Sequence, residues 1–571
     1  MKAGRSEVPI MEPPIMESKT PPAAEAVANQ SSPFADVNLF TLDAALQGVV
    51  KREGGQGAAA RLTSFGALAG SAEALDHGRL ANENPPRLQT HDAKGRRLDV
   101  VEFHPSWHWL MAASADEGLH CGAWGHLDGE SPLRPGANVE RAGAFYIAAQ
   151  MEAGHCCPLT MTNAAIPVIR DVPAVAAVWL PKLTRRQYDQ RFLPLARKSA
   201  ATVGMGMTEK QGGTDVRANA TQAVRDGAGG TGGAYRLTGH KWFMSAPMCD
   251  AFLVLAQATG GLSCFLVPRF RPDDTVNALH FQRLKNKLGN RSNASSEVEF
   301  AAAHGVLLGE EGRGVATIIE MVMHTRLDCA VASAALMRRA VAEALHHTRQ
   351  RHVFGRTLAS QPIMASVLAD LALEVEAATA LAFRLARSFD RASDSRAAAW
   401  RRLMTPVTKY WVCKVASPVI GEAMECMGGN GYVEDGGMPR LYREAPVNSI
   451  WEGSGNVMAL DMLRVLEKEP EAVEMVLDDL GQAAGDDTHL KASLARVATM
   501  LHEPRLIEMR ARALMEGLAL TAAGCIIRAH APQAVGDAFI AARLSGVPRF
   551  TYGQGLEWSD TKAILARVLP E

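Results

Sequence analysis

A glutamate in the run IWEGSGN, residues 450–456, has the surroundings of a residue that moves protons. Glu452 stands between Trp451 and Gly453. A carboxylate beside an aromatic ring, on a turn that enters a helix, suits a general base in a partly apolar site. Gly453 and Gly455 let the backbone come close to a ligand and allow positive φ. This stretch therefore contains a candidate base.

The same stretch has a simpler interpretation as the ordinary start of a helix. Ser454 or Asn456 would then be the N-cap residue, and Glu452 would be a solvated acid. Helix starts of this composition are common, so the stretch alone favours the simpler interpretation. The rest of the chain has to decide between the two.

Four other segments combine glycines with hydroxyl, aromatic or guanidinium side chains. In chain order they are MGMTEKQGGTD (205–215), GHKWFMSAP (239–247), RQRHVFG (349–355) and MGGNGY (427–432). Glycine permits close approach to a ligand, a hydroxyl can donate to a phosphate oxygen, and arginine can clamp a pyrophosphate. Taken singly, each also has a plain explanation as a helix cap, a buried strand end or a turn.

Hydrophobic spacing predicts the elements that must position these segments. Apolar residues at helical spacing predict helices on both sides of a strand-rich region, which contains about seven short runs between 202 and 302. A hairpin-like excursion is expected at 91–100, and a polar turn is expected between Gly437 and the IWEGSGN run. The expected units are a disordered tail (1–36), a helical domain (37–200), a β-barrel (201–305), a four-helix bundle (306–468) and a further helical domain (469–571).

Composition narrows the class of protein. The chain has 571 residues, 47% hydrophobic and 21% charged, which is ordinary for a globular protein. A net charge of −1 excludes nucleic-acid binding by the charge of the whole molecule. No run reaches the roughly 18 apolar residues that cross a bilayer, so no membrane association is expected. The nine cysteines contain no CxxC pair, which predicts reduced thiols in the cytoplasm and no metal site.

The order of the five segments resembles the acyl-CoA dehydrogenase family of flavoproteins, over roughly Ala144 to Leu466. The resemblance implies an α+β, mostly α fold: an N-terminal helical domain, a middle β-barrel and a C-terminal four-helix bundle. It implies FAD between barrel and bundle, which accepts hydride from the substrate β-carbon while a carboxylate removes the α-proton. That carboxylate lies in an aromatic-Glu-Gly-Ser/Thr turn, which matches Glu452.

The same resemblance names the positions that would contact the flavin. Thr208 would contact its pyrimidine edge, Thr214 its pyrophosphate, and Ser245 the region of N5. Lys210 replaces a proline usual in the family, and Thr214 replaces a frequent serine. The positions that would contact FAD from the same subunit are Met207, Thr208, Gly213, Thr214, Phe243, Met244, Ser245, Trp451, Gly453, Ser454 and Asn456.

Other matched positions would reach the FAD of a neighbouring subunit, so the resemblance implies an oligomer, a homotetramer. Arg351 would clamp the pyrophosphate and Phe354 would pack against the adenosine or flavin edge. Arg326 matches an arginine near the family's CoA-binding region. The positions assigned to a neighbour's FAD are Arg351, Phe354, Gln361, Gly428, Gly429 and Gly431.

A finer likeness is to the alkylation-response, AidB-type branch of the family. The runs RLANENPPRLQTHDAKGRRLDVVEFHPSWHWLM, RLKNKLGNRSNASSEVEF and LYREAPVNSIWEGSGN are similar to that branch's versions. The branch has an added C-terminal helical domain and is associated with double-stranded DNA. Residues 471–571 contain ten Lys/Arg against thirteen Asp/Glu, a net charge of −3, which departs from a DNA-binding domain. The local candidates are Arg464, Arg505 and Arg512, although solvated helix faces explain these arginines equally well.

The sequence thus predicts an FAD-binding, acyl-CoA dehydrogenase-like oxidoreductase of the DNA alkylation-response type, with an acyl-CoA and duplex DNA as candidate partners. The alternative is an ordinary acyl-CoA dehydrogenase that oxidises a short or branched acyl-CoA without binding DNA. A helical scaffold that has lost the flavin is the plainest hypothesis, and the intact flavin segments argue against it.

Overall fold

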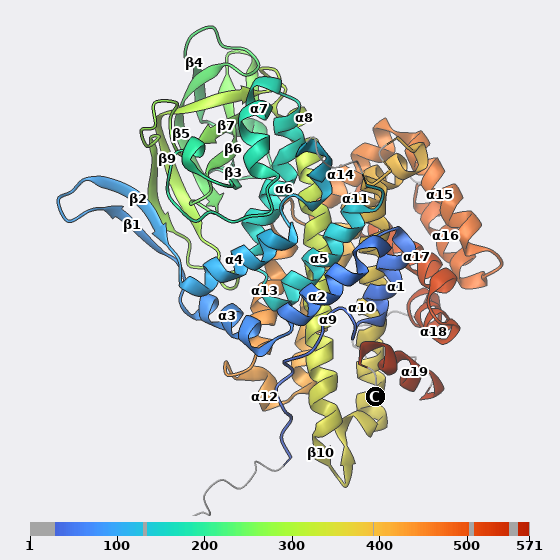
Figure 1. The fold of residues 1–571 in the computed structure, drawn as a ribbon. Helices are drawn as coiled ribbons and strands as arrows, with labels where there is room; N and C mark the ends of the chain where they lie inside the picture. Colours follow the sequence, from blue (N-terminus) through green and yellow to red (C-terminus); the bar gives the residue numbers. More distant parts are fainter. Residues whose placement is uncertain (1–28, 129–133, 392, 502–506, 547–557, 570–571) are drawn as a thin grey trace, which may run out of the picture.

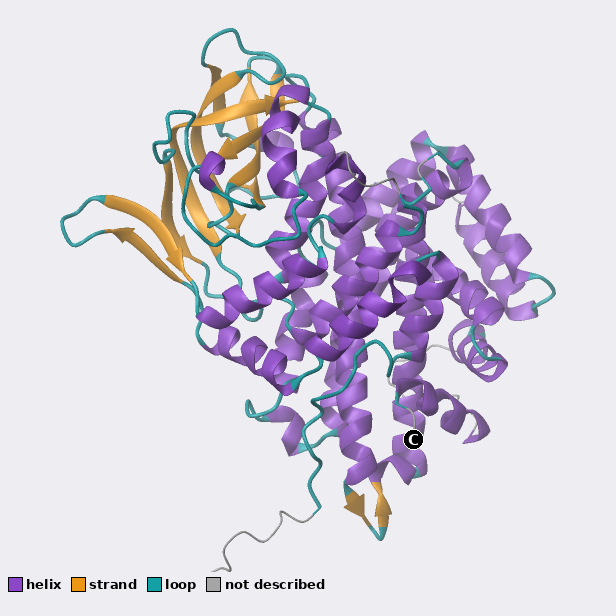
Figure 2. Cartoon of the chain, viewed as in Figure 1, coloured by secondary structure: helices purple, strands orange, loops and turns teal. Residues whose placement is uncertain are grey.

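The computed structural model describes residues 29–128, 134–391, 393–501, 507–546 and 558–569. A barrel lies beside a central group of long helices, and a further group of helices covers the side of that group away from the barrel (Figure 1). Strands are concentrated in the barrel, and the rest of the chain is mostly helical (Figure 2). The predicted α+β, mostly α class is confirmed.

The N-terminal unit is helical with one projecting hairpin. Its hairpin is antiparallel, pairs Arg87 with Glu102 and matches the predicted excursion. Pro105 opens α4 at the position where a missing N–H costs nothing, and Gly118 ends it at φ 84. The elements are α1 (Ala44–Glu53), α2 (Ala59–Ala69), α3 (Ala72–Glu83), β1 (Arg87–His91), β2 (Arg97–Glu102), α4 (Pro105–Glu117), α5 (Ala137–Met151), α6 (Cys156–Arg170) and α7 (Pro173–Leu183).

Seven strands form the barrel in the order β3-β5-β4-β6-β7-β9-β8, and additional β3–β6 and β5–β9 pairings close it. Its interior is filled by fully buried aromatic rings, including Phe252, Phe265 and Phe281. Burial of each such ring contributes roughly 2 to 3 kcal/mol. The strands are β3 (Val203–Thr208), β4 (Gln222–Arg225), β5 (Ala234–Ser245), β6 (Ala251–Ala258), β7 (Gly261–Pro268), β8 (Leu279–Leu284) and β9 (Ser295–Leu308).

The bundle is built on α9 (Ile319–Gln350), which is buried along most of its length. Arg141 of α5 holds it through a buried bidentate pair with Asp328, at 2.7 Å for each bond. The remaining elements are α8 (Gly314–Thr317), β10 (His352–Val353), β11 (Arg356–Thr357), α10 (Pro362–Phe389), α11 (Ser395–Cys426), α12 (Gly429–Tyr432), α13 (Met438–Asn448) and α14 (Gly455–Lys468).

The prediction of a polar turn after Gly437 is wrong, because most of that stretch forms the helix α13. Leu441 and Ala445, four residues apart, are buried against the bundle, and Glu444 is buried with them. The Glu444 carboxylate accepts hydrogen bonds from the backbone and side chain of Asn290, at 2.6 and 2.7 Å. The charged residues that favoured a turn are therefore those of an amphipathic helix.

The C-terminal unit packs on α10 through buried ion pairs. Arg543 lies 2.7 Å from Asp370 and 2.6 Å from Glu374, and Arg567 donates to Glu376 over 2.8 Å. Burial lowers the pKa of Arg543, but Glu374 and Asp370 outweigh burial and raise it overall. The helices are α15 (Pro470–Ala484), α16 (Thr488–Leu501), α17 (Ile507–His530), α18 (Gln533–Leu544) and α19 (Trp558–Val568).

Residues 29–36, assigned from composition to a disordered tail, are fastened to the end of α9, whereas 1–28 lie outside the described residues. Ser31 shares a 2.9 Å hydrogen bond with His347, and Arg339 donates to the Phe34 carbonyl over 2.8 Å. Composition does not show these partners, because they lie more than three hundred positions away in sequence.

In the described part of the chain, every helix is too short or too polar to span a bilayer.

Candidate functional site

Glu452 lies in a strained turn between α13 and α14. Its φ is 56°, in the left-handed region that non-glycine residues rarely adopt, and Gly453 follows at φ 101°. This conformation costs a residue with a Cβ about 1 to 2 kcal/mol. A side chain at position 453 would also press on Met458 and Val457. The turn therefore needs glycine after the acid and an external restraint on the acid itself.

The restraint comes from two basic side chains on two different helices. Lys409 of α11 donates to the carbonyl oxygens of Trp451 at 2.9 Å and Gly453 at 2.5 Å. Arg326 of α9 donates to the Glu452 carbonyl over 3.1 Å. Hydrogen bonds to charged groups contribute about 1.5 to 3 kcal/mol each, so the three together outweigh the backbone strain.

The Glu452 side chain is directed inward and is not a solvated acid. It is half-buried, and its Oε2 accepts a 2.8 Å hydrogen bond from the Thr325 hydroxyl of α9. Ser454 occupies the N-cap position of α14 but makes no capping hydrogen bond through its side chain, and Asn456 is exposed in the first turn. The interpretation of this stretch as an ordinary capped helix with a solvated acid is therefore wrong.

The turn faces the barrel through Trp451 and a buried thiol. Trp451 packs against the hydrophobic cluster that contains Met205 and Met244 of the barrel. Cys157 of α6 lies between the two parts: burial raises the pKa of Cys157 to about 12, the Glu452 charge also raises it, and hydrogen bonding to Ser245 lowers it. Ser245 and Glu452 therefore act on one common neighbour.

On the barrel side, Met207 and Thr208 end β3 and are half-buried. A side chain at Gly213 would collide with the Thr208 hydroxyl, so this glycine keeps the hydroxyl accessible. Thr214 is exposed on the same loop, and Lys210 sits 5.9 Å from the Trp242 ring centroid. Glycine and hydroxyl thus form an open cradle at the edge of the barrel.

Phe243 offers an apolar surface beside that cradle, with 47% of it exposed. The Lys285 ammonium lies 4.6 Å from its ring centroid. Met244, next in the strand, is fully buried, and its carbonyl accepts from Ser296 over 3.1 Å. A large aromatic ring that stays half-exposed next to hydroxyls and glycines suits contact with a planar ligand.

The residues assigned to a neighbour's FAD lie at the other end of α9. Arg351 follows the last residue of α9 and donates to the Asn29 carbonyl over 2.6 Å. Phe354 is 98% exposed at φ 50° on the tip of the β10–β11 hairpin, and Gln361 donates to the Val353 carbonyl over 3.2 Å. Figure 1 shows this hairpin at the end of the molecule farthest from the barrel.

The turn Gly428–Gly431 lies near that end too, where Gly428 is the N-cap residue of α12 and the other three residues form its start. Gly428 has φ 59 and ψ −141, a combination that glycine adopts readily. Asn430 within it donates to Gln30 over 2.8 Å, which links the turn to the same N-terminal segment that holds Arg351.

The sequence-predicted residues therefore form two separate groups in one chain. Thr325 beside Glu452 and Gln350 before Arg351 are 25 positions apart on α9, which corresponds to about 38 Å. The candidate base Glu452, its turn and the barrel residues form the first group. Arg351, Phe354 and the Gly428–Gly431 turn form the second.

A large cavity extends from the edge of the barrel toward the second group. Its volume is about 1240 Å³, and it runs from Lys285 and Lys287 beside the barrel to Asn430 beside the Gly428–Gly431 turn. Burial lowers the pKa of Lys287 to about 8. The 95% buried Arg339 lines the same cavity, and its Nη1 has no hydrogen-bond partner among the described residues.

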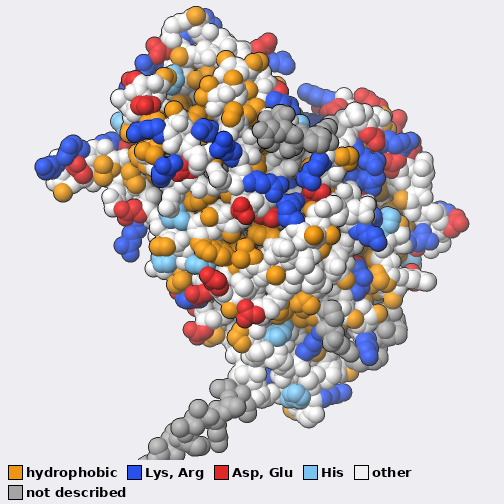
Figure 3. All heavy atoms as spheres, in the orientation of Figure 1, with side chains coloured by type: hydrophobic (Ala, Val, Ile, Leu, Met, Phe, Trp, Pro, Cys, Tyr) orange, Lys and Arg blue, Asp and Glu red, His pale blue; other side chains and the backbone are white. Residues whose placement is uncertain are grey.

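Of the DNA candidates, Arg464 and Arg512 are exposed, and Arg505 lies outside the described residues. Arg512 of α17 lies 6.0 Å from the Tyr410 ring centroid, next to the start of α14. Lys and Arg side chains gather on one face between the barrel and the C-terminal helices (Figure 3).

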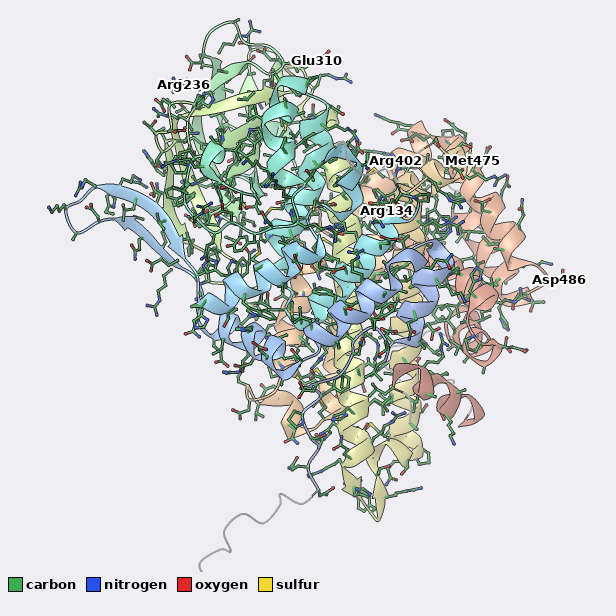
Figure 4. All side chains as sticks on the ribbon, in the orientation of Figure 1. Arg134, Arg236, Glu310, Arg402, Met475 and Asp486 are labelled. Atoms are coloured by element: carbon green, nitrogen blue, oxygen red, sulfur yellow. The ribbon has the colours of Figure 1, made fainter. Side chains whose placement is uncertain are left out.

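Sequence reasoning missed Thr325, Lys409 and Cys157. Arg326 was found from its match to the family's CoA-binding region, which stays a prediction; in the structure it donates to the Glu452 carbonyl and pairs with Asp461 at 2.5 Å. The pair continues to Arg402, which Figure 4 labels at the border of the C-terminal unit and which also bonds Glu469 over 2.8 Å. Nothing in the local sequence marks a buried lysine on a helix as a partner of a turn 42 positions later.

This arrangement, an acid in a restrained turn facing a barrel edge of hydroxyls, glycines and an aromatic ring, defines a flavoprotein oxidoreductase. Comparison with family models gives three matches: the adaptive response protein AidB N-terminal domain over 29–190, the acyl-CoA dehydrogenase middle domain over 204–303, and its C-terminal domain over 312–467. The chain belongs to the acyl-CoA dehydrogenase family, in its AidB-type branch, and has FAD as its cofactor.

Individual relatives agree with this assignment. The putative acyl-CoA dehydrogenase AidB of Escherichia coli is 50% identical over 84% of this chain and 87% of its own length. The crystal structure of Caenorhabditis elegans ACDH-11 in complex with C11-CoA matches with a TM-score of 0.80 at 27% identity, covering 96% of this chain and 93% of that one. An acyl-CoA dehydrogenase of Bacillus anthracis complexed with FAD shares the fold, with a TM-score of 0.61 at 18% identity over 81% and 82%.

Proposed function

We propose that this protein oxidises an acyl-CoA thioester between its α and β carbons, with Glu452 as the base that removes the α-proton. The observation that carries the proposal is the restrained, inward-facing Glu452 carboxylate on the barrel side of the bundle. An acid held in one rotamer beside apolar walls suits proton abstraction from carbon, because the reacting atoms must be aligned before transfer.

Each part of the site has a separate task in this reaction. Thr325 orients the Glu452 carboxylate, and Trp451 excludes water on one side. Bound FAD supplies the acceptor for the hydride that leaves the β-carbon. The α-proton passes to a Glu452 carboxylate oxygen. The electron pair left on the α-carbon forms the new double bond as the hydride leaves the β-carbon, so the reaction is balanced.

The residues present fit FAD. Thr208 and Thr214 offer hydroxyl donors, and the absence of a side chain at Gly213 keeps the Thr208 hydroxyl open. The half-exposed Phe243 ring offers a flat apolar wall, and Ser245 completes the edge. Met207, Met244, Gly453, Ser454 and Asn456 are assigned to the same site by their match to the family's segments.

We propose that each FAD is shared between two subunits of a homotetramer. Arg351, Phe354, Gln361 and the Gly428–Gly431 turn are roughly 38 Å along α9 from the base, too far to contact the same flavin within one chain. Phe354 is exposed on a projecting hairpin, as expected of an apolar residue that contacts another subunit. Two-fold pairing would then serve two sites at once.

The substrate class is tested by anaerobic titration of the FAD-loaded protein with acyl-CoAs of short, branched and medium chain, including the eleven-carbon chain held by the Caenorhabditis elegans relative. Loss of flavin absorbance with one chain class supports the proposal and selects the substrate. Unchanged absorbance with every acyl-CoA would overturn it. A response to short or branched chains in a protein that does not bind DNA would favour an ordinary acyl-CoA dehydrogenase.

Binding of duplex DNA is a second candidate function, carried by the AidB-type branch and by the local gathering of basic side chains in Figure 3. Because the net charge is −1, binding would rest on a local surface rather than on the whole molecule. Arg464, Arg505 and Arg512 are the proposed contacts, with a role in the response to DNA alkylation. We place this activity in the cytoplasm, where the nine free cysteines would stay reduced.

A further inference from the structure

We infer that Lys409 is the positioning residue of the catalytic turn: its ammonium holds the Trp451 and Gly453 carbonyls and thereby fixes Glu452 in the left-handed conformation that aims its carboxylate into the site. The inference rests on the proposed function of Glu452 and deepens it. It concerns a side chain of α11, outside the segments that the sequence assigned to the site.

The geometry is that of a clamp across the acid. Lys409 donates to the residue before Glu452 at 2.9 Å and to the residue after it at 2.5 Å. Because a peptide unit is planar and trans, a Trp451 carbonyl turned toward Lys409 turns the Glu452 N–H the opposite way. The Gly453 carbonyl belongs to the peptide unit that follows Gly453, so Lys409 holds the first and third of the three peptide units around Glu452 and Gly453, and Arg326 holds the middle one. With the two outer units held, the φ and ψ angles of Glu452 and Gly453 have little freedom, so the clamp sets the direction of the Glu452 side chain.

The surroundings of Lys409 are unusual for a lysine. The side chain is 1% exposed, and no carboxylate forms an ion pair with it among the described residues. Burial of an ammonium is costly unless strong partners compensate, and an apolar residue of the same length would remove that cost. Among the described residues, the Lys409 ammonium donates its hydrogen bonds to carbonyl oxygens of the turn. A buried lysine that directs its described donors to one turn is explained by what that turn does.

The clamp and the other restraints have different tasks. Thr325 bonds the carboxylate itself, and Arg326 bonds the Glu452 carbonyl while it pairs with Asp461. Lys409 alone of these three bonds the residues on both sides of the base. Its loss should therefore free the backbone of the turn, whereas loss of Thr325 should free only the side chain.

Three variants of the FAD-loaded, full-length protein test the inference. Lys409→Met keeps the length and removes the donors, Lys409→Arg keeps a cation, and Lys51→Met is the control because Lys51 is an exposed lysine on α1. Thermal unfolding and the ratio of flavin to protein are measured first. We expect Lys409→Met to stay folded and to keep its flavin, because the substitution removes a buried charge.

The first readout is amide hydrogen exchange in a peptide that covers residues 449–456, which does not depend on activity. We expect exchange in this peptide to rise about tenfold in Lys409→Met, to rise less in Lys409→Arg, and to stay unchanged in Lys51→Met. Exchange elsewhere in α9 and α11 should stay constant. An unchanged turn in Lys409→Met would overturn the inference, as would a uniform rise across the whole protein.

The second readout is the rate of flavin reduction at saturating acyl-CoA. We expect Lys409→Met to lower this rate about a hundredfold with little change in KM, because a misplaced base slows chemistry more than binding. Lys409→Arg should recover part of it. A normal rate in a loosened turn would also overturn the inference. If no acyl-CoA reduces the wild-type flavin, the proposed function fails, and the exchange experiment still decides the role of Lys409.

Discussion

The Thr325 hydroxyl donates a 2.8 Å hydrogen bond to the Glu452 carboxylate, across 127 positions of sequence. Thr325 lies near the start of α9, and Glu452 lies in the turn before α14. The bond joins α9, which is buried along most of its length, to the proposed base. It leaves the other carboxylate oxygen available for a proton.

Replacement of Glu452 by glutamine is expected to keep FAD bound and to slow acyl-CoA-driven flavin reduction roughly a hundredfold or more. The amide preserves shape and the Thr325 contact but removes the base. Stopped-flow absorbance measures the rate. Glu467→Gln, an exposed acid on α14, is the matched control. Reduction of the Glu452→Gln flavin at the wild-type rate would show that another group takes the proton.

Replacement of Arg351 by alanine is expected to weaken FAD binding in a neighbouring subunit rather than in its own. Mixed with Glu452→Gln after joint unfolding and reassembly, it should regain activity at about one quarter of the sites, since half of the pairs are mixed and each has one intact site. Activity assays of the mixture and of each variant alone measure this. A mixture as inactive as its components would place Arg351 and Glu452 at sites within one chain.

Replacement of His324 by phenylalanine is expected to make the fold less sensitive to acid. Burial lowers the pKa of His324 to about 3 from 6.5, and the charges of Arg141, Arg401 and Arg170 add to the effect. As pH falls from about 6.5 to about 3, the unfolded chain takes up the proton first, so stability falls by up to about 1.4 kcal/mol per pH unit.

Phenylalanine keeps the ring contacts with Trp124 and Phe389 and removes this proton uptake. Melting temperatures at pH 7 and pH 5 measure the difference, with the exposed His91→Phe as control. An equal loss of melting temperature in the wild type and in His324→Phe would contradict the prediction.

Neutralisation of Arg464, Arg505 and Arg512 is expected to weaken binding to duplex DNA and to flatten its salt dependence by about one unit for each arginine–phosphate pair that is removed. Fluorescence anisotropy over a salt series measures both quantities. Neutralisation of Arg87, Lys94 and Arg96, exposed on the β1–β2 hairpin, changes the charge equally at the far side of the molecule. Absence of wild-type binding at low salt would end the DNA proposal and leave the flavin proposal intact.

The fold and the candidate base were accessible from sequence, the fold through hydrophobic spacing and the candidate base through the order of five segments that resembles the family. Helical spacing separates α9, α10 and α11 from the strands, and IWEGSGN presents its acid between an aromatic ring and glycines. The restraints on that acid were not accessible. Thr325 and Lys409 lie on helices far away in sequence, and only the crossing of those helices brings them to the turn.

The prediction for the stretch before the candidate base was wrong for a different reason. Arg440, Arg443 and Glu444 made it look like a solvated turn, whereas Glu444 is buried against Asn290. The sequence alone does not distinguish an exposed acid from a buried acid that accepts two hydrogen bonds.

The acids on α10 bear on how the C-terminal unit can be studied. Asp370, Glu374 and Glu376 are at most 9% exposed, and Arg543 and Arg567 of α18 and α19 neutralise them. A chain that ended after α14 would expose three carboxylates together with the apolar strip of α10, and an excised tail would lose the partners of its own arginines. The two parts are not modular. A chimera should carry both, and a DNA-binding assay on the isolated tail would examine a fragment in which Arg543 and Arg567 lack their partners.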